Sequence, residues 1–270
     1  MSPAEERSKS YDRIAERYDA TRGYSAEGTA RIAQILAAEF TRRGRVLEIG
    51  IGTGQLALEL HAAGVDVMGV DRSVPMLSKV GEKAGGRPPF PLVVGDATEM
   101  PFADGAFDAA YFRWILHLIR GWRDVLTEAI RVVGPGGVIV GEIGGFAGPK
   151  NEVQRHYEEL AGVVSKPIGL PWSDWASLDA HMVALGCRVR LLPSFDDPDR
   201  QSLSELIDAT ERDIYSWTWN LDEETRIRCA QETRAWARER FGDLEGIRHV
   251  FRIEWHAYEV GGGPSSSRAG

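Results

Sequence analysis

Strands and helices are predicted to alternate five times between residues 45 and 143, and this alternation constrains the fold more than any other feature of the chain. The predicted strands are short apolar runs rich in β-formers, at 45–50, 65–71, 91–96, 107–114 and 138–143. Most of the segments between them show helical periodicity or a helix-capping residue. Short buried strands joined by crossover helices form a parallel sheet that is covered on both faces. The sequence therefore predicts an α/β fold with a doubly wound sheet.

Two helical segments are expected before this region. Aromatic residues recur at helical offsets between Ser10 and Tyr24, and a second helix is predicted to start near Ser25. The apolar residues of that second helix fall on one face, and Gly44 is expected to end it.

Beyond Gly148 the predicted elements are more widely spaced. Helices are expected at 151–164 and 175–185, and strands at 187–195 and 248–260. Ser202 and Glu205 have the spacing of a capping box, which opens a helix whose apolar side runs from Leu203 to Trp217. A further helix is expected from Asp222 to Phe241. These two helices form an insertion between the last strands that could cover a pocket.

Charge and composition limit the partners. The chain carries 32 basic and 40 acidic side chains, a net charge of −8, which disfavours nucleic acid and anionic membranes as partners. Cys187 and Cys229 lack metal-ligand spacing, so we expect no metal site and a reduced, cytoplasmic setting. No run of 18 apolar residues and no signal peptide is recognised. The Gly/Ser-rich end, 261–270, is expected to be disordered.

A glycine-rich block follows the first predicted strand. It reads Glu48-Ile49-Gly50-Ile51-Gly52-Thr53-Gly54. Glycines allow a left-handed backbone and a close approach to a ligand, and this position is the ligand crevice of a doubly wound sheet. The dinucleotide pattern G-x-G-x-x-G fails, because Gln55 stands at its third glycine. The alternative interpretation is a tight strand-to-helix turn without a ligand.

Two further acids end the second and third predicted strands. The Asp71 carboxylate could accept hydrogen bonds from two ribose hydroxyls, and Asp96 could accept one from an exocyclic amine. By itself, Asp71 could equally be a helix cap or a surface acid. Acids at three successive strand ends, with Glu48 the first, favour one ligand site.

Together these residues resemble a known family. The segments E-x-G-x-G-x-G, GDATEMPF, FDAAYFRWILHL and RVVGPGGVIV, with Asp71, are similar to class I S-adenosylmethionine-dependent methyltransferases, in the type 11 or UbiE-like small-molecule group. The resemblance covers about residues 10–145. It implies a Rossmann-like, seven-stranded sheet whose last strand is antiparallel. The expected organisation is one domain, 1–260, with an N-terminal lid (10–40), a cofactor-binding core (44–145) and a substrate-side region (146–260).

The resemblance also implies which residues bind S-adenosylmethionine. Glu48 would support the loop and the cofactor's amino group, Asp71 would accept from the ribose hydroxyls, and Asp96 from the adenine amine. The N-terminal segment would close over the cofactor and place Tyr11, Tyr18 and Arg22 near its carboxylate, although Tyr18 could be a packing residue and Arg22 a solvated charge. The other implied positions are Gly50, Gly52 and Gly54 at the methionine part, Arg72, Met76 and Ala97 at the adenine, and Arg113 at the amino-acid part.

Two residues are candidates for proton transfer. His117 follows the fourth predicted strand and has a side chain suited to a base near neutral pH; it could instead be a packed structural histidine. Glu142 ends the fifth strand and could orient the substrate or accept a proton, or only support other side chains. Transfer of an activated methyl group by in-line displacement needs a base only when the nucleophile's proton must leave early.

Aromatic residues outside the motif region are candidates for the substrate walls. Trp172 and Trp175 lie in the middle of the chain, and Tyr215, Trp217 and Trp219 near the end of an inserted helix. Aromatic walls favour an apolar or aromatic small molecule, although any one of these residues could belong to the core. No NPPY-like motif follows the fourth strand, which argues against amide or adenine-nitrogen substrates.

The predicted function is methyl transfer from S-adenosylmethionine to a small-molecule acceptor, with oxygen slightly favoured over nitrogen or carbon. The expected assembly is a monomer or homodimer. One alternative is a nicotinamide-dependent oxidoreductase on the same fold. Another is a non-catalytic, cofactor-binding interaction protein.

Overall fold

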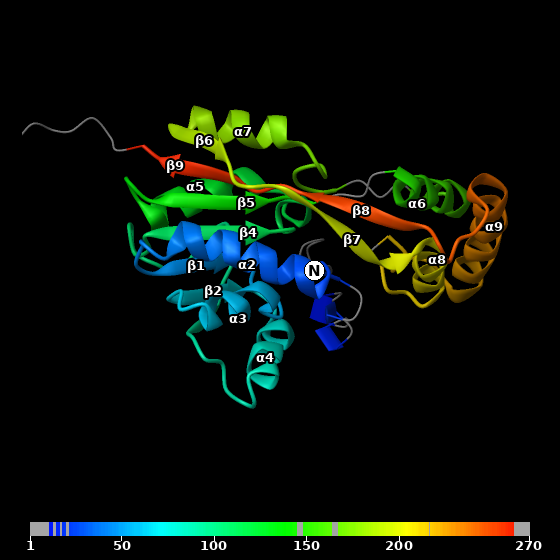
Figure 1. Ribbon diagram of the computed structural model, residues 1–270, viewed down its shortest axis with the longest axis horizontal. Coiled ribbons are helices and arrows are strands. Elements are labelled where there is room, and N and C mark those ends of the chain that lie inside the picture. Colours follow the sequence, from blue (N-terminus) through cyan, green and yellow to red (C-terminus); the bar gives the residue numbers. More distant parts are fainter. Residues whose placement is uncertain are drawn as a thin grey trace, which may run out of the picture.

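The computed structural model describes residues 11–12, 15–16, 18–19, 22–144, 148–163, 167–215 and 217–261. Its main sheet has seven strands in the order β3-β2-β1-β4-β5-β9-β6 (Figure 1). β9 runs antiparallel to both β5 and β6, whereas the pairs among β1 to β5 are parallel. The strands of this sheet are β1 (Val46–Ile49), β2 (Val67–Asp71), β3 (Leu92–Val94), β4 (Ala109–Arg113), β5 (Val138–Glu142), β6 (Cys187–Leu191) and β9 (His256–Val260). The predicted seven-stranded sheet with an antiparallel last strand is confirmed.

Helices cover both faces of this sheet. Successive residues of a strand point to opposite faces, and in these strands the residues on both faces are mostly apolar. Val46 and Tyr111 belong to a core shared with α2 and α3, whereas Leu47 and Phe112 belong to a core shared with α5 and α7. The helices around the sheet are α2 (Ala26–Phe40), α3 (Gln55–Ala62), α4 (Val74–Lys83), the 3₁₀ turn η1 (Leu116–Leu118), α5 (Trp122–Val133) and α7 (Trp175–Ala184).

The start of α2 is as predicted, and its end is earlier. The Ser25 hydroxyl accepts a hydrogen bond from the Gly28 amide and caps the helix. The helix ends at Phe40 with Thr41 as its C-cap, so Gly44 lies beyond the end that we predicted for it.

A two-stranded ribbon extends from the sheet. β7 (Phe195–Ser202) pairs antiparallel with β8 (Arg248–Ile253), with an irregular register between Pro198 and Ser202. The sequence predicted one unbroken strand over 248–260; the structure divides it into β8, which pairs with β7, and β9, which joins the sheet. β7 was not predicted, because its sequence FDDPDRQS contains aspartates and a proline that are rare in strands.

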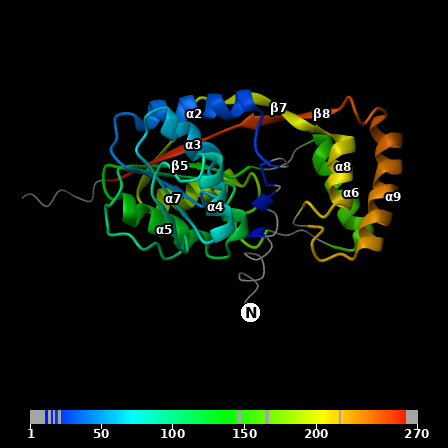
Figure 2. The same ribbon diagram turned by 90° about the horizontal axis from the view of Figure 1, so that it is seen from below.

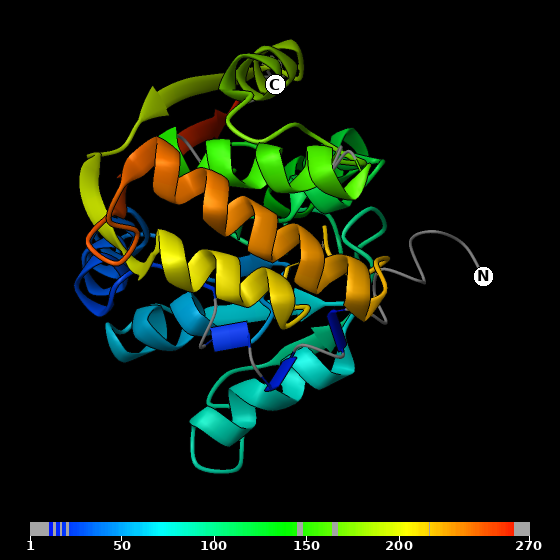
Figure 3. The same cartoon turned by 90° about the vertical axis from the view of Figure 1, so that its right-hand side faces the viewer.

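Three helices form a unit beside the far end of the ribbon, which we call the cap: α6 (Gly148–Ala161), α8 (Leu203–Glu211) and α9 (Glu223–Phe241). They share a separate apolar core, and they stand side by side, away from the main sheet (Figures 2 and 3). The Ser202–Glu205 capping box and the Asp222 cap are present as predicted. α8 ends at Glu211, before Trp217, so the predicted helix was too long.

Among the residues that the structure describes, no helix is both long and apolar enough to cross a lipid bilayer. Cys187 and Cys229 are both free and buried. Residues 262–270 of the predicted tail lie outside the described residues.

Candidate active site

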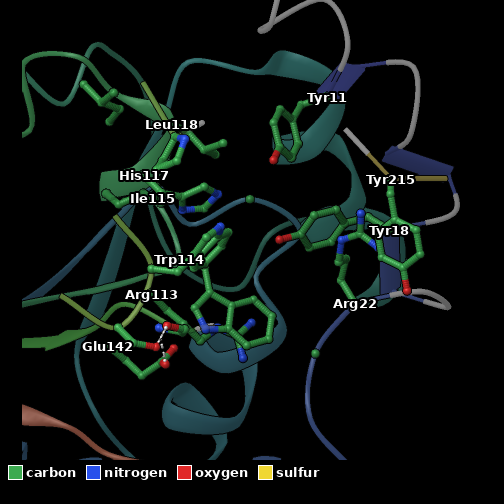
Figure 4. Close-up of a pocket in the computed structure, with 18 of the residues that line it drawn as sticks. Tyr11, Tyr18, Arg22, Arg113, Trp114, Ile115, His117, Leu118, Glu142 and Tyr215 are labelled. Atoms are coloured by element: carbon green, nitrogen blue, oxygen red, sulfur yellow. Dashed lines mark hydrogen bonds between the residues drawn. The ribbon is translucent and has the colours of Figure 1, made fainter. Parts of the chain in front are cut away.

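A cavity of about 1110 Å³ lies between the carboxyl ends of the strands and the cap. The residues predicted for the site line it, except Glu48, Gly54 and Trp219. Tyr11, Tyr18, Arg22 and Tyr215 lie on one side of the cavity, and Trp114, Ile115, His117 and Leu118 on the other (Figure 4).

The glycine-rich loop after β1 has the backbone that the sequence predicted. Gly50, Gly52 and Gly54 have φ angles of +72°, +54° and +70°, in the left-handed region that glycine tolerates best. A Cβ on Gly50 would approach the Ile115 side chain to 2.4 Å, whereas a Cβ on Gly52 would meet no atom within 4 Å. Gly52 therefore faces open cavity, and Gly54 caps α3 against Val80 instead of lining the cavity.

Asp71 at the end of β2 is held by two backbone amides. The Gly52 amide donates to its Oδ2 at 2.8 Å, and the Ser73 amide donates to its Oδ1 at 2.9 Å. Burial raises the pKa of Asp71, and these amides oppose the rise because they stabilise the carboxylate. Each carboxylate oxygen has a second lone pair, so Asp71 can bind the loop and accept from a ligand at once.

The position after β3 provides a second acceptor. Asp96 is hydrogen-bonded through Oδ1 to the amide and hydroxyl of Thr98. Although burial opposes ionisation, these bonds lower the pKa of Asp96, so it is a carboxylate at neutral pH. Ala97, Arg72 and Met76 complete this part of the lining, as predicted.

Glu48 does not reach the cavity. Its side chain is buried beneath the loop, where Oε2 accepts a hydrogen bond from the Tyr111 hydroxyl at 2.8 Å. Burial raises the pKa of Glu48 to about 7, against the opposing effect of Arg113. The Glu48 side chain is therefore hydrogen-bonded to β4 and does not line the cavity.

Glu142 lines the cavity at the end of β5. Its Oε1 accepts a hydrogen bond from the Gly144 amide at 2.6 Å (Figure 4). Burial raises its pKa to about 8, although Arg113, Tyr24 and Trp114 lower it. Glu142 therefore holds its proton at neutral pH in the protein without ligands.

Trp114 is a lining residue that the sequence analysis did not single out. It has a φ of +56°, which is unusual for a bulky side chain and marks local strain. Its ring lies 4.8 Å from the Arg113 guanidinium and packs edge-on against Tyr24. No sequence pattern signals a left-handed tryptophan after a strand, because the conformation is imposed by the surrounding packing.

The N-terminal segment is fastened over the glycine-rich loop. Asp19 accepts hydrogen bonds from the Thr53 hydroxyl at 2.5 Å and from the side-chain amide of Gln55 at 2.8 Å. Burial raises the pKa of Tyr18, whose hydroxyl lies in the same region as Arg113 and Arg22. Arg22 donates to the Ile214 carbonyl and lies 4.3 Å above the Tyr215 ring. The segment therefore links the loop to the cap.

The aromatic candidates pack in pairs. The His117 ring contacts Trp172 with centroids 3.5 Å apart and ring planes tilted by 32°, and Trp175 stacks on His256 at 3.8 Å. His117 is half-buried and lines the cavity, so it packs against an aromatic ring and also faces the site.

A second set of aromatic residues lies between α8 and α9. Tyr215 stacks on Trp217 with centroids 4.1 Å apart, and both line the cavity. Trp219 contacts Tyr11 edge-on at 5.5 Å and donates to the Asp213 carbonyl, outside the lining.

The outer wall of the cavity was largely missed by the sequence analysis. It comes from one face of α6 and from the ribbon, and it includes the ion pair between Lys150 and Asp199, both of which are buried. These residues match no motif, and α6 lies next in space to β8 only through the tertiary fold.

Comparison with known proteins places the chain in a family. A family model described as a methyltransferase domain matches residues 47–141. The demethylmenaquinone methyltransferase of Mycolicibacterium vanbaalenii is 34% identical over 197 residues, which cover 65% of this chain and 83% of that protein. The chain belongs to the class I S-adenosylmethionine-dependent methyltransferases.

Two other relatives match a shorter part of this chain. The demethylmenaquinone methyltransferases of Renibacterium salmoninarum and Beutenbergia cavernae are 35% and 39% identical over 133 residues, 48% of this chain. The match covers 55% and 54% of those proteins, so the chain spans about half the length of these relatives.

Solved structures agree in fold. The YcgJ protein of Bacillus subtilis superposes with a TM-score of 0.57 at 20% identity, covering 88% of this chain and all of that one. The [4+2]-cyclase SpnF superposes with a TM-score of 0.51 at 17% identity, covering 90% of this chain and 85% of that one. A cyclase among the neighbours shows that this fold alone does not determine the reaction.

The described residues fit the family's cofactor. Gly52 leaves open space where a side chain would otherwise stand, and Asp71 and Asp96 present acceptors at adjacent strand ends. The cavity is also large enough for a cofactor and a second small molecule, since ligand pockets usually measure about 300–1,000 Å³.

Proposed function

We propose that this protein transfers a methyl group from S-adenosylmethionine to a small-molecule acceptor bound between the sheet and the cap. The observation that carries the proposal is the arrangement around Gly52 and Asp71: an open, left-handed glycine is hydrogen-bonded to a half-buried carboxylate that lines the cavity. Family membership supports the same reaction.

The residues at the carboxyl ends of β1, β2 and β3, which we call the inner half of the cavity, would hold the cofactor. When bound, S-adenosylmethionine supplies a methyl group on a positively charged sulfur. Asp71 accepts hydrogen bonds from the ribose hydroxyls, and Asp96 accepts from the adenine amine while Ala97 offers its backbone amide. Tyr11, Tyr18 and Arg22 line the same cavity, where they can contact the amino-acid end of the cofactor.

The remaining lining positions the acceptor. In-line displacement at an activated methyl depends mostly on alignment and exclusion of water. His117 and Trp172 on one side, and Tyr215 and Trp217 on the other, provide flat aromatic walls for an apolar or aromatic acceptor. We retain oxygen as the favoured acceptor atom.

His117 and Glu142 have different roles towards the acceptor. His117 is the proton acceptor when a hydroxyl is methylated, because its ring is at the cavity surface. Glu142 lines the same cavity at the end of β5, where its carboxyl group can orient the acceptor.

Calorimetry with S-adenosylmethionine, S-adenosylhomocysteine and NAD tests the proposal. We expect the first two to bind and NAD not to bind. Asp71→Ala should weaken the binding of S-adenosylmethionine and of S-adenosylhomocysteine by about 1–3 kcal/mol, the cost of leaving polar partners unsatisfied. This corresponds to about 5- to 150-fold in Kd.

Asp66→Ala is the matched control, because Asp66 is a mostly exposed acid just before β2 that does not line the cavity. Binding of NAD alone would support the oxidoreductase instead. Cofactor binding without turnover on any metabolite of a broad panel would support the non-catalytic alternative.

A further inference from the structure

The outer half of the cavity comes from residues outside the part of the chain that the family model matches. That model spans 47–141, whereas α6, the ribbon and the turn after α8 lie beyond residue 147. Membership of the family therefore says little about the chemistry of this half, and its own side chains must indicate what it binds.

α6 turns its polar face towards the cavity. Lys150, Gln154 and Glu158 are spaced by four residues and line the cavity, as do Asn151 and Arg155 beside them. The apolar residues of α6, such as Val153 and Tyr157, pack into the core of the cap. The polar face of an amphipathic helix normally faces bulk water, so its position here makes the outer half of the cavity hydrophilic.

A buried ion pair lies within this hydrophilic wall. The Lys150 ammonium contacts the Asp199 carboxylate, and the two side chains are only 1% and 7% exposed. Gln201 donates its backbone amide to Asp199 at 2.9 Å, so the carboxylate is fixed in place. Burying two charges is costly, and an apolar pair of similar volume is often as stable or more stable. The packing of the cap therefore does not require a lysine at this position.

The lining of the whole cavity carries a small excess of cations within an acidic protein. Seven cations line it, against six acids; the cations are Arg22, Arg72, Arg113, Arg120, Lys150, Arg155 and Arg252, and the acids are Asp71, Asp96, Glu142, Glu158, Asp199 and Glu254. His249 adds no positive charge to this balance, because burial lowers its pKa and keeps it neutral. The sulfonium of the bound cofactor would add a further positive charge, so the complete site attracts an anion.

We infer that the acceptor carries a carboxylate, which binds in the outer half of the cavity beside Lys150 and Arg155 while its apolar or aromatic body lies between the aromatic walls. This inference rests on the proposed function, because it concerns the acceptor of that reaction. Asp199 positions the Lys150 ammonium, and Lys150 supplies a charged hydrogen-bond donor to the carboxylate.

Three matched phenols test the inference on protein saturated with S-adenosylhomocysteine: 4-hydroxyphenylacetate, its neutral amide and the cationic amine tyramine. Calorimetry should show that the acid binds at least tenfold more tightly than the amide and the amine, since a hydrogen bond to a charged group contributes roughly ten- to hundredfold. Equal affinities, tighter binding of tyramine, or no binding of any of the three at millimolar concentration would overturn the inference.

Variants separate recognition from packing. The double change Lys150→Met with Asp199→Leu removes both charges together, and it should abolish the preference for the acid. Lys150→Arg should keep that preference, and Arg155→Gln on the exposed rim of the same face should reduce it severalfold. Arg228→Met is the matched control, because it removes a cap cation outside the cavity lining and should change nothing.

The two proposals fail in different ways. If the double variant keeps the acid preference, Lys150 is not the anchor and the inference is wrong, while cofactor binding stands. If the wild type does not bind S-adenosylhomocysteine at all, the proposed function is wrong.

Discussion

Gly52→Ala tests the cofactor loop with a single methyl group. Gly52 lines the cavity with a φ of +54°, and a Cβ there would meet no protein atom within 4 Å. Without ligand, the cost is therefore the left-handed backbone alone, about 1–2 kcal/mol of stability. With ligand, the methyl group would occupy space that the cofactor needs, and overpacking costs about 1–3 kcal/mol.

Gly64→Ala is a control with the same backbone cost. Gly64 follows α3 with a φ of +87°, a Cβ there would also meet nothing within 4 Å, and it lies outside the cavity lining. Both variants should lose similar stability in urea unfolding. Only Gly52→Ala should bind S-adenosylhomocysteine more weakly in calorimetry, by about 5- to 150-fold. Wild-type affinity in Gly52→Ala, or equal losses in both variants, would refute the assignment of the loop.

Other predictions concern the buried acids and the proposed base. Burial raises the pKa of Glu142 from its ordinary 4.5 to about 8, so the native state binds this proton more tightly than the unfolded chain, and the stability of the wild type falls as the pH rises between these values. In urea unfolding, Glu142→Gln should therefore gain stability relative to wild type between pH 5 and pH 8.5. A difference that stays constant with pH would contradict the burial argument. Tyr111→Phe removes the hydrogen bond to buried Glu48 and should cost about 1–3 kcal/mol of unfolding free energy, and a neutral result would show that this bond contributes nothing. His117→Gln should slow turnover of a hydroxyl acceptor by about 10²- to 10⁴-fold. The control is His181→Gln, which alters a histidine packed on α5 outside the lining and should leave turnover unchanged. Equal rates in both variants would assign His117 to packing alone.

The inner half of the site could be predicted from the sequence because its residues are fixed by local rules. Gly50 and Gly52 follow a strand and need left-handed backbone, and Asp71 and Asp96 end neighbouring strands of one sheet. Parallel strands place their carboxyl ends at one edge, so the order of residues along the chain is sufficient to bring these groups together.

The outer half could not be predicted in the same way. Lys150 and Asp199 belong to segments 49 residues apart that meet only when the ribbon carries β7 alongside α6 and β8. The ribbon itself was hidden, since Asp196, Asp197 and Pro198 disfavour a strand. For Glu48, the motif identified the residue but not its contact. Its side chain is buried against Tyr111, and this packing decides its role.

The most direct test of the account is a crystal structure of the protein with S-adenosylhomocysteine. We predict that both ribose hydroxyls lie within hydrogen-bond distance of the Asp71 carboxylate, that the adenine lies beside Asp96 and Met76, and that the sulfur faces the half of the cavity lined by His117 and Lys150. A ligand bound elsewhere, with Asp71 contacting only the Gly52 and Ser73 amides, would contradict the claim that this cavity is a methyl-transfer site.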